Sequence, residues 1–107
     1  MEAAQMRRIV DGKRYDTETA QKIGHESRGN CGDFRAWSET LYKTKKGAFF
    51  IAGEGGPMTR WGKSSGNESW GDEGIIALTP KEALEWCSEY LDDASQYEDF
   101  FDGIEDA

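Results

Sequence analysis

Two runs of strand-forming residues joined by a short polar turn constrain the fold of this chain more than any other stretch. Residues 34–44 and 48–52 are rich in aromatic and β-branched side chains, and residues 45–47 (KKG) connect them. A polar connection that ends in glycine favours a β-hairpin, because glycine supplies the positive φ of a type I turn with a bulge. The stretch therefore predicts the nucleus of an antiparallel sheet.

Side chains alternate between the two faces of a strand, so the hairpin also predicts which residues share a face. In the second run, Phe49 and Ile51 lie on one face and Phe50 on the other. Aromatic side chains on both faces predict a central position in the sheet. One face of the first run carries four residues: Trp37, Glu39, Leu41 and Lys43.

Short elements are expected before the hairpin. Residues 7–10 form a strand that a turn at Asp11-Gly12 closes, and residues 13–15 pair back onto it. Asp16 has the character of an N-cap, which predicts a short helix over residues 17–23. The composition of residues 24–33 predicts a loop.

The segment after the hairpin is rich in glycine. Residues 53–57 (GEGGP) are expected to leave the sheet, 58–62 to form a helical turn, 63–74 to be a loop and 75–78 to form a strand. A glycine-rich loop raises phosphate binding as an alternative. Neither the Gly-Lys-Ser/Thr of a P-loop nor a GxGxxG that opens a helix is present, so we interpret GEGGP as a turn.

The strongest helix signal lies near the C-terminus. Thr79, Pro80 and Glu82 form a capping box with proline at the first helical position, which predicts a helix over residues 80–91. Asp93 or Ser95 can cap a last helical segment that runs through Phe101. The predicted core stripe of the helix has helical spacing: Ala83, Leu84, Cys87, Tyr90 and Leu91.

These elements predict an α+β fold. We expect a small, mainly antiparallel sheet of about four strands, a short N-terminal helix and a longer C-terminal helix. The 107 residues are enough for a single domain over 1–107. Within it, residues 1–5 are expected to be frayed, and residues 92–107 form an acidic C-terminal tail that can be helical.

The net charge of −8 is unevenly distributed. Residues 1–66 hold 12 Lys and Arg against 8 Asp and Glu, whereas residues 67–107 hold Lys81 alone against 13 acids. Such asymmetry predicts an acidic surface, which disfavours anionic membranes and nucleic acid and favours basic partners. The alternative is that the acidic third folds against the basic part of the same chain.

Carboxylates at helical spacing could present this acidic surface to a partner. A basic groove that is built to hold phosphates would attract such an array as it attracts DNA. The aromatic residues Tyr97, Phe100 and Phe101 could add an apolar anchor, or could fold inward beneath an ordinary solvated face. The candidate partner-binding residues are Glu82, Glu85, Glu89, Asp92, Asp93, Glu98 and Asp99.

Catalytic and metal-binding signatures are weak. A His25–Cys31 nucleophile pair lacks an orienting acid, and His25, Cys31 and Cys87 lack a fourth metal ligand and a recognisable ligand spacing. We therefore expect no enzyme activity, no metal and no cofactor, and a Cys31–Cys87 disulfide has no positive support. The first residues contain no long apolar run, so we expect no signal peptide, no membrane span and a cytoplasmic location.

Binding to nucleic acid is the alternative from a different class. The expected hairpin tip is basic and lies close to aromatic residues, as in sheets that stack RNA bases. A sequence pI of about 4.6 argues against it. The residues that would carry it are Lys43, Lys45, Lys46, Arg60 and Lys63.

Four segments resemble a family of small acidic proteins encoded on bacterial plasmids, prophages and other mobile elements. They are residues 12–20 (GKRYDTETA), residues 42–59 (YKTKKGAFFIAGEGGPMT), a Trp–loop–Gly segment that follows, and a pattern II-x-LT-x-x-EA-x-x-W that ends at Trp86. The resemblance covers roughly residues 7–91, and its most specific part is the YKTKKGxFFxxGEGGPM run.

Some members of this family are similar in size, acidity and genetic setting to anti-CRISPR proteins. The resemblance implies an inhibitor that binds a CRISPR–Cas effector in a bacterial host cell and blocks target DNA binding, as a DNA mimic. It implies no catalytic residue. We expect a monomer or weak dimer that binds the effector through its acidic surface and does not bind nucleic acid directly.

Overall fold

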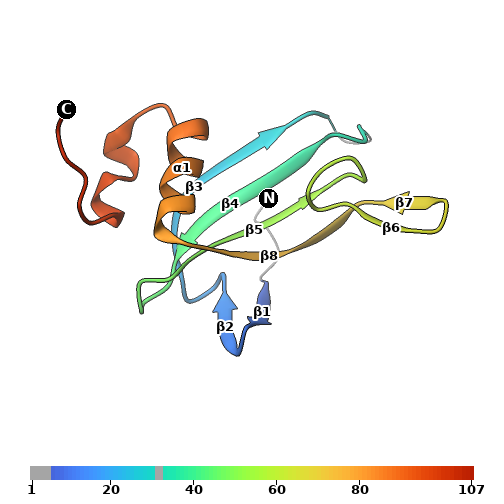
Figure 1. The fold of residues 1–107 in the computed structure, drawn as a ribbon, viewed down its shortest axis with the longest axis horizontal. Helices are drawn as coiled ribbons and strands as arrows, with labels where there is room; N and C mark the ends of the chain where they lie inside the picture. The colour runs from blue at the N-terminus through green and yellow to red at the C-terminus, as the bar shows by residue number, and fades with distance from the viewer. Residues whose placement is uncertain (1–5, 31–32) are drawn as a thin grey trace.

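A computed structural model describes residues 6–30 and 33–107 of the chain. Along the described part of the chain, eight strands come first, and one α-helix and two 3₁₀ turns follow them (Figure 1). The strands are β1 (Arg7–Val10), β2 (Lys13–Asp16), β3 (Gln21–Arg28), β4 (Trp37–Lys43), β5 (Phe49–Gly55), β6 (Lys63–Ser65), β7 (Glu68–Trp70) and β8 (Asp72–Leu78). The helices are α1 (Pro80–Tyr90) and the two 3₁₀ turns η1 (Ala94–Gln96) and η2 (Glu98–Phe100).

The main sheet has four antiparallel strands in the order β3-β4-β5-β8. The predicted hairpin is its centre, because β4 pairs with β5 from Lys43↔Phe49 to Trp37↔Gly55. The turn uses Gly47 at φ +89°, the left-handed conformation that glycine tolerates best. The α+β class and the antiparallel four-stranded sheet are confirmed.

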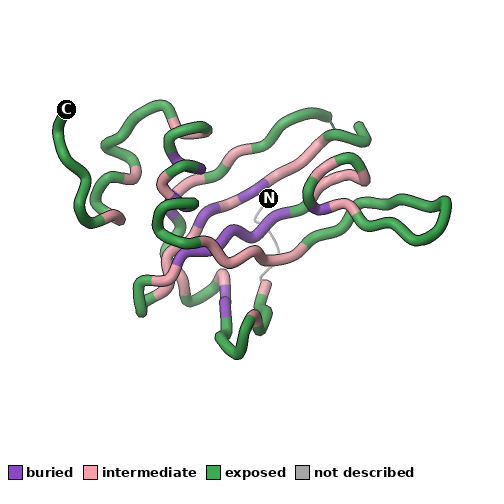
Figure 2. The backbone as a smooth tube through the Cα atoms, in the orientation of Figure 1, coloured by how far each residue is buried: buried purple, intermediate pink, exposed green. Residues whose placement is uncertain are grey.

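Side chains on both faces of β5 are buried, and most of this strand has the colour of buried residues in Figure 2. Phe49 and Ile51 pack under α1 in the larger core cluster, while Phe50 and Ala52 pack in a second cluster with Tyr15 of the β1–β2 hairpin. Residues 49–53 are all buried. The central position predicted for this strand from its aromatic residues is therefore confirmed.

Helix α1 matches the predicted C-terminal helix. The Thr79 side chain accepts a hydrogen bond from the Glu82 backbone N–H, and the Glu82 side chain accepts one from the Thr79 N–H. The helix buries Ala83 and Cys87 as expected, but it also buries Trp86, which the predicted core stripe omits.

The acidic C-terminal segment continues past α1 in two 3₁₀ turns that lie beside the helix (Figure 1). Residues of this segment contact β4 and β5. The Phe101 ring stacks on Phe49 with centroids 4.8 Å apart, and Lys43 Nζ donates to the Phe100 carbonyl at 2.7 Å. Tyr97 packs against the same core. The aromatic side chains of this segment thus fold inward.

The predicted N-terminal helix over residues 17–23 is wrong. Asp16 does accept the Glu18 backbone N–H at 2.9 Å, but the resulting turn ends by Ala20 and the chain enters β3 at Gln21. A helix this short gains little from its own hydrogen bonds. Pairing with β4 satisfies the backbone and still buries Ile23, so the extended form is adopted.

Three predicted loops contain strand. Residues 24–28 belong to β3, and residues 53–55 extend β5 instead of leaving the sheet. The expected loop over 63–74 forms the β6–β7 hairpin and the start of β8, and its Trp70 is exposed. Glycine and polar residues suggested loops here, but sheet pairing overrides that local tendency.

Two further expectations fall on residues 1–5 and on Cys31, and both lie outside the described residues. Among the residues that the structure describes, no helix has the length and apolar character needed to cross a membrane.

Candidate functional site

One carboxylate, Glu39, is buried on the face of the sheet beneath α1. Each of its oxygens accepts two hydrogen bonds. Arg60 donates through Nη2 to Oε1 at 2.6 Å and through Nε to Oε2 at 2.7 Å. The indole Nε1 of Trp86 donates to Oε1 at 2.9 Å, and that of Trp61 donates to Oε2 at 2.8 Å. We call these four residues the Glu39 cluster.

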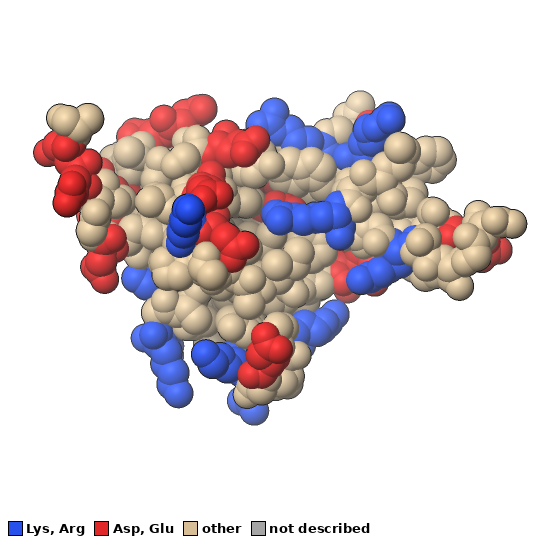
Figure 3. Space-filling view, in the orientation of Figure 1, with Lys and Arg blue, Asp and Glu red and all other residues tan. Residues whose placement is uncertain are grey.

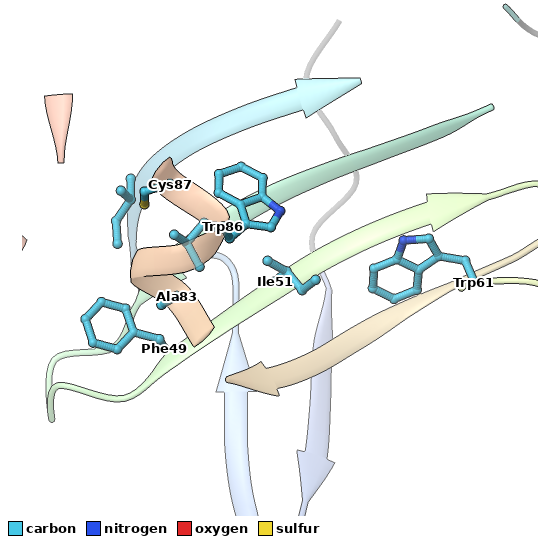
Figure 4. Close-up of a cluster of buried hydrophobic side chains, with 8 residues drawn as sticks. Phe49, Ile51, Trp61, Ala83, Trp86 and Cys87 are labelled. Atoms are coloured by element: carbon cyan, nitrogen blue, oxygen red, sulfur yellow. The ribbon is translucent and has the colours of Figure 1, made fainter. Parts of the chain in front are cut away.

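The two indoles that donate to Glu39 come from different parts of the fold, 22 and 47 residues further along the chain. Trp86 comes from α1 and Trp61 from the segment between β5 and β6, and both lie over the sheet (Figure 4). Trp61 can lie flat because the paired residues Gly53 and Gly74 have no side chains under it. A Cβ on Gly53 would lie 2.5 Å from the Trp61 ring, closer than real contacts allow.

The pKa of Glu39 is lowered by its partners. Burial alone would raise it, but the hydrogen bonds from Arg60, Trp86 and Trp61 and the charge of Arg60 outweigh that cost. The hydrogen bond with Glu39 raises the pKa of Arg60 in turn. Glu39 and Arg60 are therefore a charged pair at neutral pH, and both oxygens of the carboxylate accept two hydrogen bonds each.

A groove with a volume of about 570 Å³ lies above this cluster, between α1 and the segment from Met58 to Trp61. Trp37 and Tyr90 also line it, with ring centroids 5.2 Å apart in an edge-to-face arrangement. Trp37 and Tyr90 are half-buried, while Met58 is 58% exposed.

Three of the predicted partner-binding residues form one wall of this groove. Glu82, Glu85 and Glu89 lie at i, i+3 and i+7 on α1, which places them on one side of the helix. All three are exposed. The capping hydrogen bonds with Thr79 lower the pKa of Glu82, so this carboxylate is also part of the helix start.

The other four predicted residues lie beyond the helix. Asp92, Asp93, Glu98 and Asp99 are exposed on the C-terminal segment, where hydrogen bonds with Ser95 lower the pKa of Asp93. Figure 3 shows acidic side chains gathered over α1 and this segment, with most Lys and Arg elsewhere. The fold thus brings the seven residues onto neighbouring elements, three in the groove and four beside it.

None of these seven carboxylates forms an ion pair within the described part of the chain. The ion pairs found there join Arg7 to Asp16, Arg28 to Glu26, and Arg60 to Glu39. The alternative was that the acidic third of the chain folds against its basic part. The ion pairs among the described residues do not support it, because none of them involves these seven carboxylates.

The basic residues of the alternative function do not form one patch. Lys43 is hydrogen-bonded to the Phe100 carbonyl, and Arg60 to Glu39. Lys45 and Lys46 are exposed at the β4–β5 turn, whereas Lys63 begins β6 at the other end of β5. Only two of the five residues lie together and exposed at the hairpin tip.

Two of the candidate catalytic and metal-binding residues, His25 and Cys87, do not line the groove. His25 is exposed on β3, where its Nδ1 is hydrogen-bonded to Thr40 Oγ1 at 2.8 Å. Cys87 is a free thiol with no exposed surface, and burial raises its pKa to about 11. Within residues 6–30 and 33–107, no three His, Cys, Asp or Glu side chains gather as a metal site would require.

The Glu39 cluster was not anticipated from the sequence. Strand alternation predicted that Glu39 shares a face with Trp37 and Leu41, and the structure confirms this. A carboxylate on an otherwise apolar face indicates that it must be paired with a cation or a hydrogen-bond donor. Its partners lie 21, 22 and 47 residues away, with no pattern that marks them. No protein-family model, curated protein or solved structure matches this chain.

Proposed function

We propose that this protein is a non-enzymatic inhibitor of anti-CRISPR type, which binds a CRISPR–Cas effector through its acidic surface and blocks target DNA binding. One observation carries the proposal: seven exposed carboxylates on α1 and the C-terminal segment have no ion-pair partner among the described residues. The resemblance of residues 7–91 to proteins of mobile elements supplies the class of partner.

The arrangement suits a binding surface. Effectors hold DNA in positively charged channels, and a protein that presents carboxylates to such a channel competes with the phosphates. The C-terminal segment is tied to the sheet through Phe101 and Lys43, so its carboxylates are presented on an ordered backbone. Less conformational entropy is then lost on binding than a free tail would lose.

The test is a competition experiment with purified effector complexes from bacteria that host such mobile elements. This protein and target DNA compete for the effector, and a gel shift measures how much DNA stays bound. A quadruple charge reversal at Glu85, Glu89, Asp92 and Asp99 to Lys should abolish inhibition. The matched control reverses four exposed carboxylates on other elements: Glu18, Glu54, Glu68 and Glu73. This control variant changes the net charge by the same amount and should still inhibit. Inhibition by the wild-type protein and by the control variant should weaken as the salt concentration rises.

Inhibition that persists after charge reversal at the four acidic-surface positions would contradict the proposed mode of binding. Failure of the wild-type protein to displace DNA from any effector tested would contradict the proposed function. Tight, salt-sensitive binding of DNA or RNA by the protein alone would favour the nucleic-acid alternative instead. The separation of Lys63 from Lys45 and Lys46 argues against that alternative.

A further inference from the structure

The groove above the Glu39 cluster has two walls of different chemistry. On the α1 wall, Glu85 and Glu89 are exposed and one helical turn apart, without an ion pair in the described part of the chain. The opposite wall holds Met58 and Arg60. The rings of Trp37 and Tyr90 also line the groove. Carboxylates beside partly exposed aromatic rings are the surroundings that a cationic side chain prefers.

We propose that this groove binds an arginine side chain from a basic segment of the partner protein. The inference rests on the proposed function and deepens it, because it names the part of the acidic surface that recognises one residue. The seven carboxylates attract a basic surface at long range. The groove then supplies the short-range contacts that select a guanidinium group.

The charges of the groove fit this occupant. Four carboxylates and two guanidinium groups line it, which leaves a net charge of −2. Arg60 is already bound through two of its nitrogens to Glu39, so its charge is compensated within the protein. Glu85 and Glu89 have no such partner among residues 6–30 and 33–107, and two adjacent carboxylates can accept several N–H donors of one guanidinium.

The aromatic residues fit it as well. The chain already places one guanidinium beside Tyr90, since the Arg28 guanidinium carbon lies 5.9 Å from the centroid of that ring. Trp37 packs edge-to-face against Tyr90 and remains half-exposed. A planar cation gains from stacking on such rings, and arginine does so more readily than lysine.

An anionic occupant is the competing possibility, because Arg35 and Arg60 also line the groove. It would have to draw Arg60 away from Glu39 or bind at Arg35 alone, with Glu85 and Glu89 opposite. Leaving Glu39 buried without its cation is costly. The observations therefore favour the cation, and an acidic peptide serves as the probe for the opposite outcome.

The experiment is an NMR titration of the full chain, labelled with ¹⁵N, with three five-residue peptides: Gly-Arg-Gly-Arg-Gly, its lysine analogue and its glutamate analogue. The arginine peptide should shift the Trp37 indole signal and the amide signals of Glu85 to Tyr90, more strongly than the lysine peptide. The glutamate peptide should leave these signals in place. Replacing Glu85 and Glu89 by Gln should weaken arginine binding about tenfold.

A matched variant separates the groove from general charge. Glu98→Gln with Asp99→Asn removes the same two charges from the C-terminal segment and should change the affinity by less than about twofold. Equal weakening by both pairs, unshifted groove signals or preferred binding of the glutamate peptide would overturn the groove assignment. The proposed function could then still hold through the wider surface. Conversely, arginine binding in the groove without displacement of DNA from an effector would leave this inference standing and remove the proposed function.

Discussion

Two kinds of carboxylate lie along the same groove, and the fold uses them in opposite ways. Glu39 is buried and accepts hydrogen bonds from Arg60, Trp61 and Trp86. Glu85 and Glu89 stand on the neighbouring helix, exposed and without an ion pair in the described residues. The buried charge links α1, the β5–β6 segment and the sheet through hydrogen bonds, whereas Glu85 and Glu89 form no ion pair with another described residue.

The difference teaches that position, more than residue type, decides what a carboxylate does in this protein. A buried charge must be paired, because the cost of removing it from water is large. An exposed charge costs little and stabilises little. Substitutions of the first kind should therefore report on folding, and those of the second kind on binding.

The largest effect is expected from Glu39→Gln. The amide cannot accept four hydrogen bonds and leaves Arg60 without its counter-charge. We expect the free energy of unfolding to fall by about 2–4 kcal/mol, somewhat less than for a fully buried pair because Arg60 is partly exposed. Urea denaturation followed by tryptophan fluorescence measures it, and a loss below about 0.5 kcal/mol would contradict a stabilising role.

The pH dependence of the same variant provides a second measurement. Because the folded pKa of Glu39 lies below its ordinary value of 4.5, the ionised carboxylate stabilises the fold fully above that pH. This contribution is lost as the pH falls through the folded pKa. The stability difference between wild type and Glu39→Gln should therefore be constant from pH 7 to 5 and shrink below pH 4.5. A difference that grows on acidification would contradict the assignment.

The next effect concerns the glycines beneath Trp61. A Cβ on Gly53 would meet the Trp61 ring at 2.5 Å and the Ser38 carbonyl oxygen at 2.8 Å, so Gly53→Ala should cost about 2 kcal/mol. Its partner Gly74 is the matched control, since a Cβ there would lie at an ordinary 3.6 Å from the same ring. Gly74→Ala should change the stability by less than about 0.5 kcal/mol. Similar losses for both variants would show that the packing of Trp61 is not the cause.

Trp86→Phe tests a single hydrogen bond of the Glu39 cluster. The phenyl ring keeps most of the apolar contact of α1 with the sheet but removes the donor to Glu39 Oε1. We expect a loss of about 1.5 kcal/mol, which is usual for a hydrogen bond to a charged acceptor. In the Glu39→Gln background the further loss should be smaller, because coupled residues are not additive. Full additivity of the two substitutions would argue against a shared network.

The smallest effect on folding is expected from the exposed pair. Glu85→Gln with Glu89→Gln should change the free energy of unfolding by no more than about 0.5 kcal/mol in either direction. The same variant should lose most of its affinity for the arginine peptide. A loss of stability similar to that of Glu39→Gln would remove the distinction between the two kinds of carboxylate.

Local sequence signals determined much of the fold. The KKG turn between alternating runs gave β4 and β5, and the capping box at Thr79 and Glu82 gave the start of α1, because both depend on residues close together in the chain. The exposure of Glu85 and Glu89 also followed from helical spacing. Where a local signal was weak, as at Asp16, the prediction of a helix was wrong because sheet pairing satisfied the backbone better.

The tertiary structure alone decided the Glu39 cluster and the groove above it. Strand alternation predicted the correct face for Glu39, and the sequence contains four tryptophans. No pattern in it indicates that Trp61 and Trp86 both donate hydrogen bonds to this one carboxylate. Gly53 was also predicted to be part of a turn. In the structure it lies in β5, where the absence of a side chain leaves room for the Trp61 ring. Contacts between residues 21 to 47 positions apart depend on how the elements pack. No local pattern encodes that packing.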